Sequence, residues 1–257
     1  MIGFLIKKNF FDTWDNLFKI GLINIGFILS LAIPIFIPTL LIETPWMGIA
    51  VLILGILWLI IYLSAAAYSL TAISDYGSFG FADFFRNLKL SWKTGLVMGM
   101  FFILFYLLIT LVIPFYLSMG NLVGLMFAAF VFWILVIAVL ALQFFFSFRA
   151  RFDDGIVKSI KKCFIVFFDN PWFCIFSFLH LIFQLFLSMF LAFIFPGPSG
   201  VLLFLDQGLR LRLLKYDWLE ENPDANRKQI PWDSILIEER DRTGTRSLRN
   251  FIFPWKD

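Results

Sequence analysis

Charged residues are scarce in this sequence and absent from long stretches of it. Only 15% of the 257 residues are Asp, Glu, Lys or Arg, and 61% are hydrophobic. A soluble chain of this length has about a quarter of its residues charged. Four runs contain no Asp, Glu, Lys or Arg at all: 20–42, 44–74, 94–148 and 170–205. This distribution excludes an ordinary soluble domain, and we expect the chain to meet the lipid bilayer and not nucleic acid.

Histidine and cysteine are also rare, with one His and two Cys. Neither Cys163 nor Cys174 lies in a segment that we expect on the outer side of a membrane, so no disulfide framework is implied. The sequence has no phosphate-binding Gly-rich loop with a Lys, no HExxH motif and no paired-cysteine metal spacing. We therefore expect a protein that is not an enzyme and that holds no cofactor or metal.

Two short motifs resemble those of intramembrane proteases, and both are incomplete. Residues 197–200 read GPSG, like the GxSG of rhomboid proteases, but the single histidine, His180, precedes them, whereas those enzymes need a later His as the base. Residues 216–217 read YD without the second GxGD motif of the aspartyl proteases. We interpret 197–200 as a turn.

The four uncharged runs predict membrane-spanning helices, since a helix needs about 20 apolar residues to cross the hydrocarbon layer. The third run holds two crossings, divided at residues 118–121, and the others hold one each. Backbone groups cannot remain unpaired in lipid, and the runs are too long for barrel strands. The sequence thus predicts an all-α polytopic membrane bundle.

Three segments suggest an internal repeat. Residues 4–27, 81–102 and 156–178 each show a Phe- and Lys-rich amphipathic stretch, a polar break and the start of an apolar run. Such amphipathic stretches suit helices that lie in the headgroup region. We expect three units, each an interfacial helix followed by a transmembrane hairpin.

By this repeat, residues 201–215 form a sixth, short crossing that returns to the starting side. With six crossings, all 21 Lys and Arg residues fall on one side and Glu43 alone among charged residues falls on the other. Positively charged residues concentrate in cytoplasmic segments. We therefore expect a bacterial inner (cytoplasmic) membrane protein with both termini in the cytoplasm, made of a bundle (1–215) and a cytoplasmic tail (216–257).

The sixth crossing carries Asp206 and Arg210 into the bundle. The two are four positions apart, in the order that favours an ion pair along a helix, and we expect them to pair there. His180, Gln184 and Ser188 form a polar stripe on the fifth crossing. Two interpretations stay open for these polar groups: hydrogen bonds to a neighbouring helix, or a path for a proton or substrate.

The tail is too aromatic for a disordered linker. We expect a short helix from Ser234 to about Thr243, capped by Asp233 and ended by Gly244. The tail should pack on the cytoplasmic face of its own bundle or dock on a partner protein. The residues expected to pack or dock are Trp218, Trp232, Phe251, Phe253 and Trp255.

Asn24 followed by Pro34, the segment FADFFRNLKLSWKTGL (81–96) and the segment FFDNPWFCIFSF (167–178) carry a family resemblance. Over about residues 10–215 the chain resembles the YesL-like family, small bacterial polytopic membrane proteins of unassigned activity. Members often occur beside sugar-uptake ABC transporter components. The resemblance implies an accessory membrane role and supplies no catalytic residues.

Two functions follow as hypotheses. The first is a non-enzymatic accessory or assembly protein that contacts a membrane protein partner. The second is a small transporter of a lipid-like or weakly polar substrate, which would use Asp206, Arg210, His180 and Gln184 between helices. A closed bundle favours the first hypothesis, and a continuous polar cavity favours the second.

Overall fold

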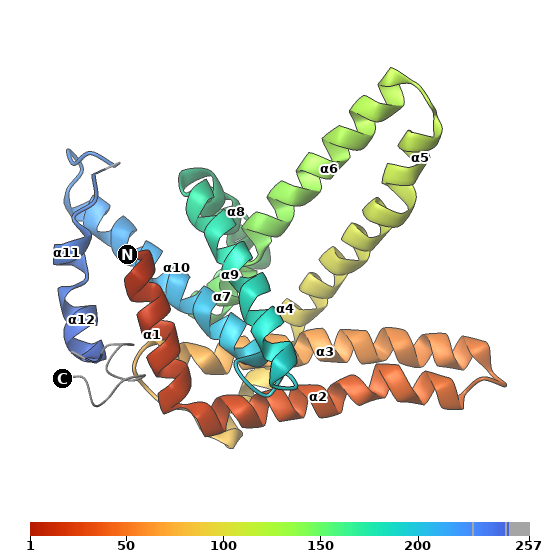
Figure 1. Ribbon diagram of the computed structural model, residues 1–257, viewed down its shortest axis with the longest axis horizontal. Coiled ribbons are helices and arrows are strands. Elements are labelled where there is room, and N and C mark those ends of the chain that lie inside the picture. Colours follow the sequence, from red (N-terminus) through yellow and green to blue (C-terminus); the bar gives the residue numbers. More distant parts are fainter. Residues whose placement is uncertain (228, 245, 247–257) are drawn as a thin grey trace.

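The computed structural model describes residues 1–227, 229–244 and 246, and in this part of the chain every regular element is a helix (Figure 1). The helices are α1 (Ile2–Asp15), α2 (Leu17–Leu40), α3 (Pro45–Ser74), α4 (Phe81–Leu107), the π-helical turn η1 (Leu108–Val112), α5 (Ile113–Ser118), α6 (Leu122–Leu142), α7 (Phe145–Arg151), α8 (Ile156–Asp169), α9 (Pro171–Phe190), α10 (Gly197–Glu221), α11 (Trp232–Ile235) and α12 (Ile237–Thr243).

Within the described residues, five helical segments are long and apolar enough to cross a membrane: Leu17–Leu40, Pro45–Ser74, Phe81–Ser118, Leu122–Arg151 and Pro171–Phe190. They are the five crossings predicted from the uncharged runs. The chain is a multi-pass helical membrane protein by this criterion. α10 is not among the five, because it carries charged residues along its length.

The first four of these segments form two long hairpins that diverge from a common base (Figure 1). Hairpin one is α2 with α3, and hairpin two is α4, η1 and α5 with α6. Inside hairpin one, Gly55 lets Pro34 approach closely, since a Cβ on Gly55 would lie 2.9 Å from the Cβ of Pro34. Between the hairpins, a Cβ on Gly95 would lie 2.7 Å from the Cα of Ile61. Small residues at such contacts are typical of membrane helix packing.

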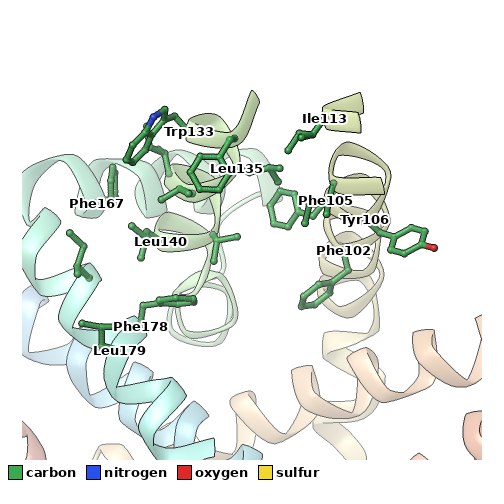
Figure 2. A pocket seen from close by; sticks show the side chains of 16 residues that line it. Phe102, Phe105, Tyr106, Ile113, Trp133, Leu135, Leu140, Phe167, Phe178 and Leu179 are labelled. Carbon is green, nitrogen blue, oxygen red and sulfur yellow. The ribbon is translucent and has the colours of Figure 1, made fainter. Parts of the chain in front are cut away.

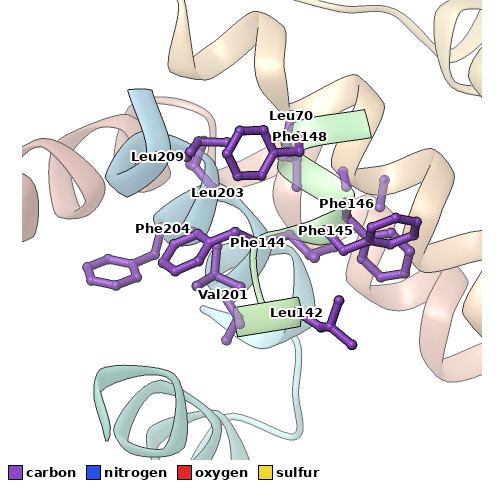
Figure 3. Close-up of a cluster of buried hydrophobic side chains, with 14 of the residues drawn as sticks. Leu70, Leu142, Phe144, Phe145, Phe146, Phe148, Val201, Leu203, Phe204 and Leu209 are labelled. Carbon is purple, nitrogen blue, oxygen red and sulfur yellow. The ribbon is translucent and has the colours of Figure 1, made fainter. Parts of the chain in front are cut away.

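The base of the molecule holds the main core, where α7, α9 and α10 meet α3 (Figure 3). Phe144, Phe145 and Phe204 are fully buried there, together with Leu203 and Leu209. α10 passes through this core, so that residues 197, 199–209 and 211 are all buried. Burial by protein on all sides explains how an apolar bundle accommodates a helix that also carries charges.

The repeat is only partly visible in the helices. α1 ends before Asn16 and α8 before Asn170, so units one and three have a separate first helix followed by a break. In unit two, however, α4 runs from Phe81 into the apolar span without interruption. The expectation of a polar break there was wrong, because 81–93 contains neither Pro nor Gly to end a helix.

Part of the charged face of α1 is buried within the protein. Lys8 is fully buried and Asp12 is 9% exposed. α1 packs against α10, and its polar face turns inward because partners for both charges lie there. The helical amphipathicity was correctly identified, but an inward polar face and an outward polar face have the same periodicity.

Candidate functional site

Asp206 lies at the centre of a buried group of charged and polar side chains. Its carboxylate accepts two hydrogen bonds from Arg151 on α7, at 2.9 Å from Nε and 2.5 Å from Nη2. Asp206 is 2% exposed. Arg151 also donates to Ser74 Oγ at 2.9 Å and to Asp75 at 3.1 Å. The two-pronged geometry is the strongest form of a carboxylate–guanidinium pair.

The predicted pair between Asp206 and Arg210 is therefore wrong. Arg210 lies one turn further along α10 and binds Asp75 instead, while its Nη2 donates to Glu239 of α12 at 2.7 Å. The i, i+4 rule describes pairs on an exposed helix surface. In a core, a buried carboxylate needs a partner with several donors, and Arg151 from another helix supplies them.

Tyr76 closes the group on the tail side. Its hydroxyl donates to Glu239 Oε2 at 2.7 Å, and its ring lies under the ammonium of Lys8, 3.4 Å from the centroid. Burial raises the pKa of Tyr76 well above its ordinary value, so the hydroxyl remains a neutral donor at physiological pH. Tyr76 thus connects α1, through Lys8, with the tail, through Glu239.

Lys8 and Asp12 form the third part of the group. The two side chains are 2.8 Å apart, and Gln207 of α10 donates to the same oxygen of Asp12 at 2.6 Å. Burial lowers the pKa of Lys8 and raises that of Asp12, because removal from water disfavours both charged forms. The pair persists because each side chain has a hydrogen-bonding partner in the core.

We call this set the polar centre. It brings together four carboxylates, three cations, a phenol, a hydroxyl and an amide: Asp12, Asp75, Asp206, Glu239, Lys8, Arg151, Arg210, Tyr76, Ser74 and Gln207. Each charged member is within an ion pair. No cluster of His, Cys, Asp and Glu suited to a metal ion occurs in the described residues. The arrangement is an ion-pair network that joins α1, the end of α3, α7, α10 and α12.

The polar stripe of α9 lies in a separate group. Gln184 donates to Asn9 of α1 at 2.7 Å and lies 3.1 Å from His180, whose ring contacts that of Phe204. Ser188 donates back to Gln184 and accepts from the amide of Gly197. The bonds to Asn9 and from Gly197 reach neighbouring elements, as the first interpretation of the stripe expects, and the other two contacts lie within α9. The structure thus places the four predicted polar residues in two groups.

The tail helices α11 and α12 pack on the chain's own bundle. Leu236 is fully buried, and Glu239 and Thr243 are 4% and 3% exposed. Trp232 lies beside Arg212, whose guanidinium is 5.4 Å from the ring. Trp218 is half-buried on the last turns of α10. The predicted docking residues Phe251, Phe253 and Trp255 lie outside the described residues.

The predicted tail helix is present in two pieces. α11 and α12 are separated at Leu236, and Gly244 ends α12 at a φ of +76°, as expected. Asp233 does not cap a helix, because its carboxylate binds Arg240 at 2.7 Å. The break turns Leu236 into the core and leaves Glu239 facing Arg210.

Sequence reasoning missed Lys8, Asp75, Tyr76, Arg151 and Glu239 as members of the polar centre. Asp75 directly follows the uncharged run 44–74, and Arg151 lies shortly after the run 94–148. Charged residues at such positions ordinarily face water. The position of these two residues beside the helix that carries Asp206 is a usable signal, because a buried charge requires an opposite charge close to it.

Two sizeable cavities lie away from the polar centre, and both are apolar. One of about 950 Å³ lies between hairpin two and α8 and α9, and its walls include Phe105, Trp133 and Phe178 (Figure 2). The other, of about 620 Å³, lies where all three helix pairs meet. Neither connects a chain of polar groups from one face to the other.

No protein-family model, characterised protein or solved structure matches this chain. Functional inference therefore depends on the chain's own residues and geometry.

Proposed function

We propose that this protein is a non-enzymatic accessory or assembly protein of the bacterial cytoplasmic membrane. The observation that carries the proposal is that each ion of the polar centre is already paired within the protein and that none of these ions lines either of the two apolar cavities. A catalytic or transport site needs ionisable groups that reach a substrate. The resemblance to the YesL-like family agrees with this role and suggests a sugar-uptake ABC transporter as the partner.

The proposal includes six membrane helices in three helix pairs, with α10 as the sixth. The chain returns to the same face after each pair, and both termini lie in the cytoplasm. Support comes from the distribution of Lys and Arg, all of which then lie on one side. A reporter protein fused after Asp257 and, in a separate chain, the same reporter inserted after Glu43 test this orientation. A reporter that is active outside the cytoplasm only when placed after Asp257 contradicts it.

An assembly role is tested by the partner's dependence on this protein. Removal of the protein from its host should lower the amount of the assembled partner complex, and restoration of the wild-type chain should return it. The partner is identified by chemical cross-linking in native membranes before purification. A host whose membrane complexes are unchanged in amount and composition contradicts the proposal.

A second function, transport of a lipid-like substrate, is favoured by the two apolar cavities. This alternative predicts movement of a fluorescent phospholipid between leaflets of vesicles that contain the purified protein. Vesicles with the protein that move lipid no faster than empty vesicles exclude it.

A further inference from the structure

The turn between α9 and α10 lies beside Asn24, far from the tip of hairpin one. The side-chain amide of Asn24 donates to Ile194 O at 3.0 Å and to Pro196 O at 2.9 Å, and its oxygen accepts from Ser199 N at 3.0 Å. Asn24 precedes the end of α2, Leu40, by 16 positions. At 1.5 Å per residue the turn therefore lies about 24 Å short of that end, measured along α2.

The side chains of the turn are those expected at a surface that does not meet water. Residues 191–196 read LAFIFP and include no charged or polar side chain. Leu191, Phe193 and Ile194 are nevertheless exposed at the protein surface, at 53%, 39% and 44%. A turn that emerged into water would carry polar residues, as the turn of hairpin two does with Asn121. The residues of 191–196 instead resemble those of a lipid-facing surface.

Several backbone groups of the turn have hydrogen-bonding partners within the protein. The amides of Leu191 and Phe193 both donate to Ser188 O, and the amide of Gly197 donates to Ser188 Oγ. Asn24 serves two carbonyls and one further amide. Irregular backbone at membrane depth is tolerated only where the protein satisfies it in this way.

Two exposed aromatic residues provide a depth scale. Phe18 at the start of α2 is 84% exposed and precedes Lys19, the last charged residue before an uncharged run, and Trp172 at the start of α9 is 82% exposed. Lys and Trp are typical of the membrane boundary. Asn24 lies six positions beyond Phe18, a depth of about 9 Å along α2. α9 spans about 27 Å from Trp172 to its end, so it must run obliquely to α2, and Figure 1 shows it crossing the direction of α2 and α3.

The apolar cavity of about 620 Å³ lies directly beyond this turn. Its α2 wall begins at Phe27, one helical turn beyond Asn24, and its inner wall includes Phe193 and Pro198 next to the turn. Hairpin two contributes Phe102 and Val139. Water needs two to four polar partners to occupy a cavity, and these walls offer almost none. The bilayer around the cavity is rich in hydrocarbon chains.

We infer that α9 and α10 form a re-entrant hairpin, which turns back inside the apolar layer, and that the cavity beyond its turn holds one hydrocarbon chain of a membrane lipid. The inference rests on the membrane placement proposed above and leaves both termini on one face. It gives the alternative function, transport of a lipid-like substrate, a specific binding site. The hydrocarbon chain enters this site from the leaflet opposite the face that carries the Lys and Arg residues.

The depth of the turn is measured by spin labels on single cysteines in vesicles of phosphatidylglycerol and phosphatidylethanolamine, with Cys163 and Cys174 replaced by Ala. Ala192→Cys reports the turn, Ile53→Cys a lipid-facing site on hairpin one, and Glu43→Cys the tip of that hairpin. Labels at Ala192 and Ile53 should collide more with oxygen than with a water-soluble nickel complex, and the label at Glu43 should show the reverse.

The outcomes separate the two proposals. Nickel-dominated collisions at Ala192, with oxygen-dominated collisions at Ile53, show that the turn reaches water and overturn the re-entrant hairpin. Nickel-dominated collisions at both sites overturn the membrane placement itself. Because the vesicles lack a partner, neither result bears on the accessory role.

Occupancy of the cavity is tested with a phospholipid that carries a photoreactive diazirine at the end of one acyl chain. Light should produce adducts on residues 27–31 and 178–185, and the bulkier Leu181→Trp should reduce them several-fold without changing adducts near Ile53. Leu31→Trp is the second variant if Leu181→Trp fails to fold. Adducts near Ile53 but none on the cavity walls overturn the lipid site.

Discussion

Asp206 and Arg151 are 55 positions apart in the chain and share two hydrogen bonds in its interior. The pair fastens α10 to α7, and through the other donors of Arg151 it also fastens both to the end of α3. Removing one member of such a buried pair leaves an uncompensated charge, which costs about 3–5 kcal/mol.

Asp206→Asn should therefore lower the free energy of unfolding by about 3–5 kcal/mol, measured by SDS titration in mixed micelles. Arg151→Gln in the same chain should restore part of this loss, because the guanidinium that has lost its buried carboxylate is then gone. The combination of Asp206→Asn with Arg210→Gln should show no such recovery. Coupling to Arg210 in place of Arg151 would contradict the observed pairing.

Asn24→Ala should destabilise the turn between α9 and α10, because two carbonyls and one amide lose their partner. Hydrogen bonds between membrane helices contribute about 0.6 kcal/mol each, so a loss near 2 kcal/mol is expected. Unfolding on heating is measured by the reaction of the buried thiols of Cys163 and Cys174 with a thiol-reactive dye. Thr39→Val, which removes a bond within α2 at an exposed position, is the control and should change the transition little.

Gly95→Ala should push α3 and α4 apart. The added Cβ would lie 2.7 Å from the Cα of Ile61, and backbone cannot yield as a flexible side chain does. Overpacking of this kind costs about 1–3 kcal/mol. Gly155→Ala, at a position with no atom within 4 Å of the new Cβ, is the matched control. Equal effects of the two substitutions would show that the close approach is unimportant.

Acid should weaken the contact between α8 and the end of α10. Partial burial raises the pKa of Asp169, but hydrogen bonds from Lys215 and Tyr216 outweigh it and hold this pKa below its ordinary value of 3.8. The stabilisation is therefore complete above pH 3.8 and is lost as the pH falls through the lower folded pKa. The melting temperature of Asp169→Asn should fall less between neutral and acidic pH than that of the wild type. The exposed Asp153→Asn serves as the control, and an unchanged pH profile in Asp169→Asn would contradict the assignment.

The docked tail should protect its backbone amides from exchange. In purified protein in detergent, amides of residues 232–243 should exchange slowly, and Glu239→Gln should speed their exchange because Arg210 and Tyr76 lose a charged partner. Glu238→Gln alters a neighbouring exposed residue and should leave exchange unchanged. Fast exchange of 232–243 in the wild type would mean that the tail is not held on the bundle in solution.

The membrane helices were predictable because their signal is local. Runs without charge mark each span, and the polar cluster 118–121 marks the turn of hairpin two. The pairing of charges was not predictable, because Asp206 chooses between Arg210 nearby and Arg151 far away according to the three-dimensional packing. The same limit applies to Lys8 and Asp12: their helical face was evident, but whether it meets water or α10 depends on residues almost 200 positions later.

The tail contains one feature that was predictable from the sequence and one that was not. Gly244 ends a helix as its local chemistry dictates, whereas the break at Leu236 follows from a hydrophobic site on the bundle. The depth of the turn beside Asn24 is likewise a tertiary property, since α9 has the length and composition of a full crossing.

α10 has its partners in segments that are synthesised before it. Asp12, Ser74, Asp75 and Arg151 have all left the ribosome when Asp206, Gln207 and Arg210 emerge, and only Glu239 follows. The charges of α10 can thus be neutralised as they arrive, without an interval in lipid. Glu239 is synthesised after every other member of the polar centre, so the polar centre is completed only when α12 emerges. A chain truncated before α12 would leave Arg210 one carboxylate short, and quality-control proteases could recognise it by that defect.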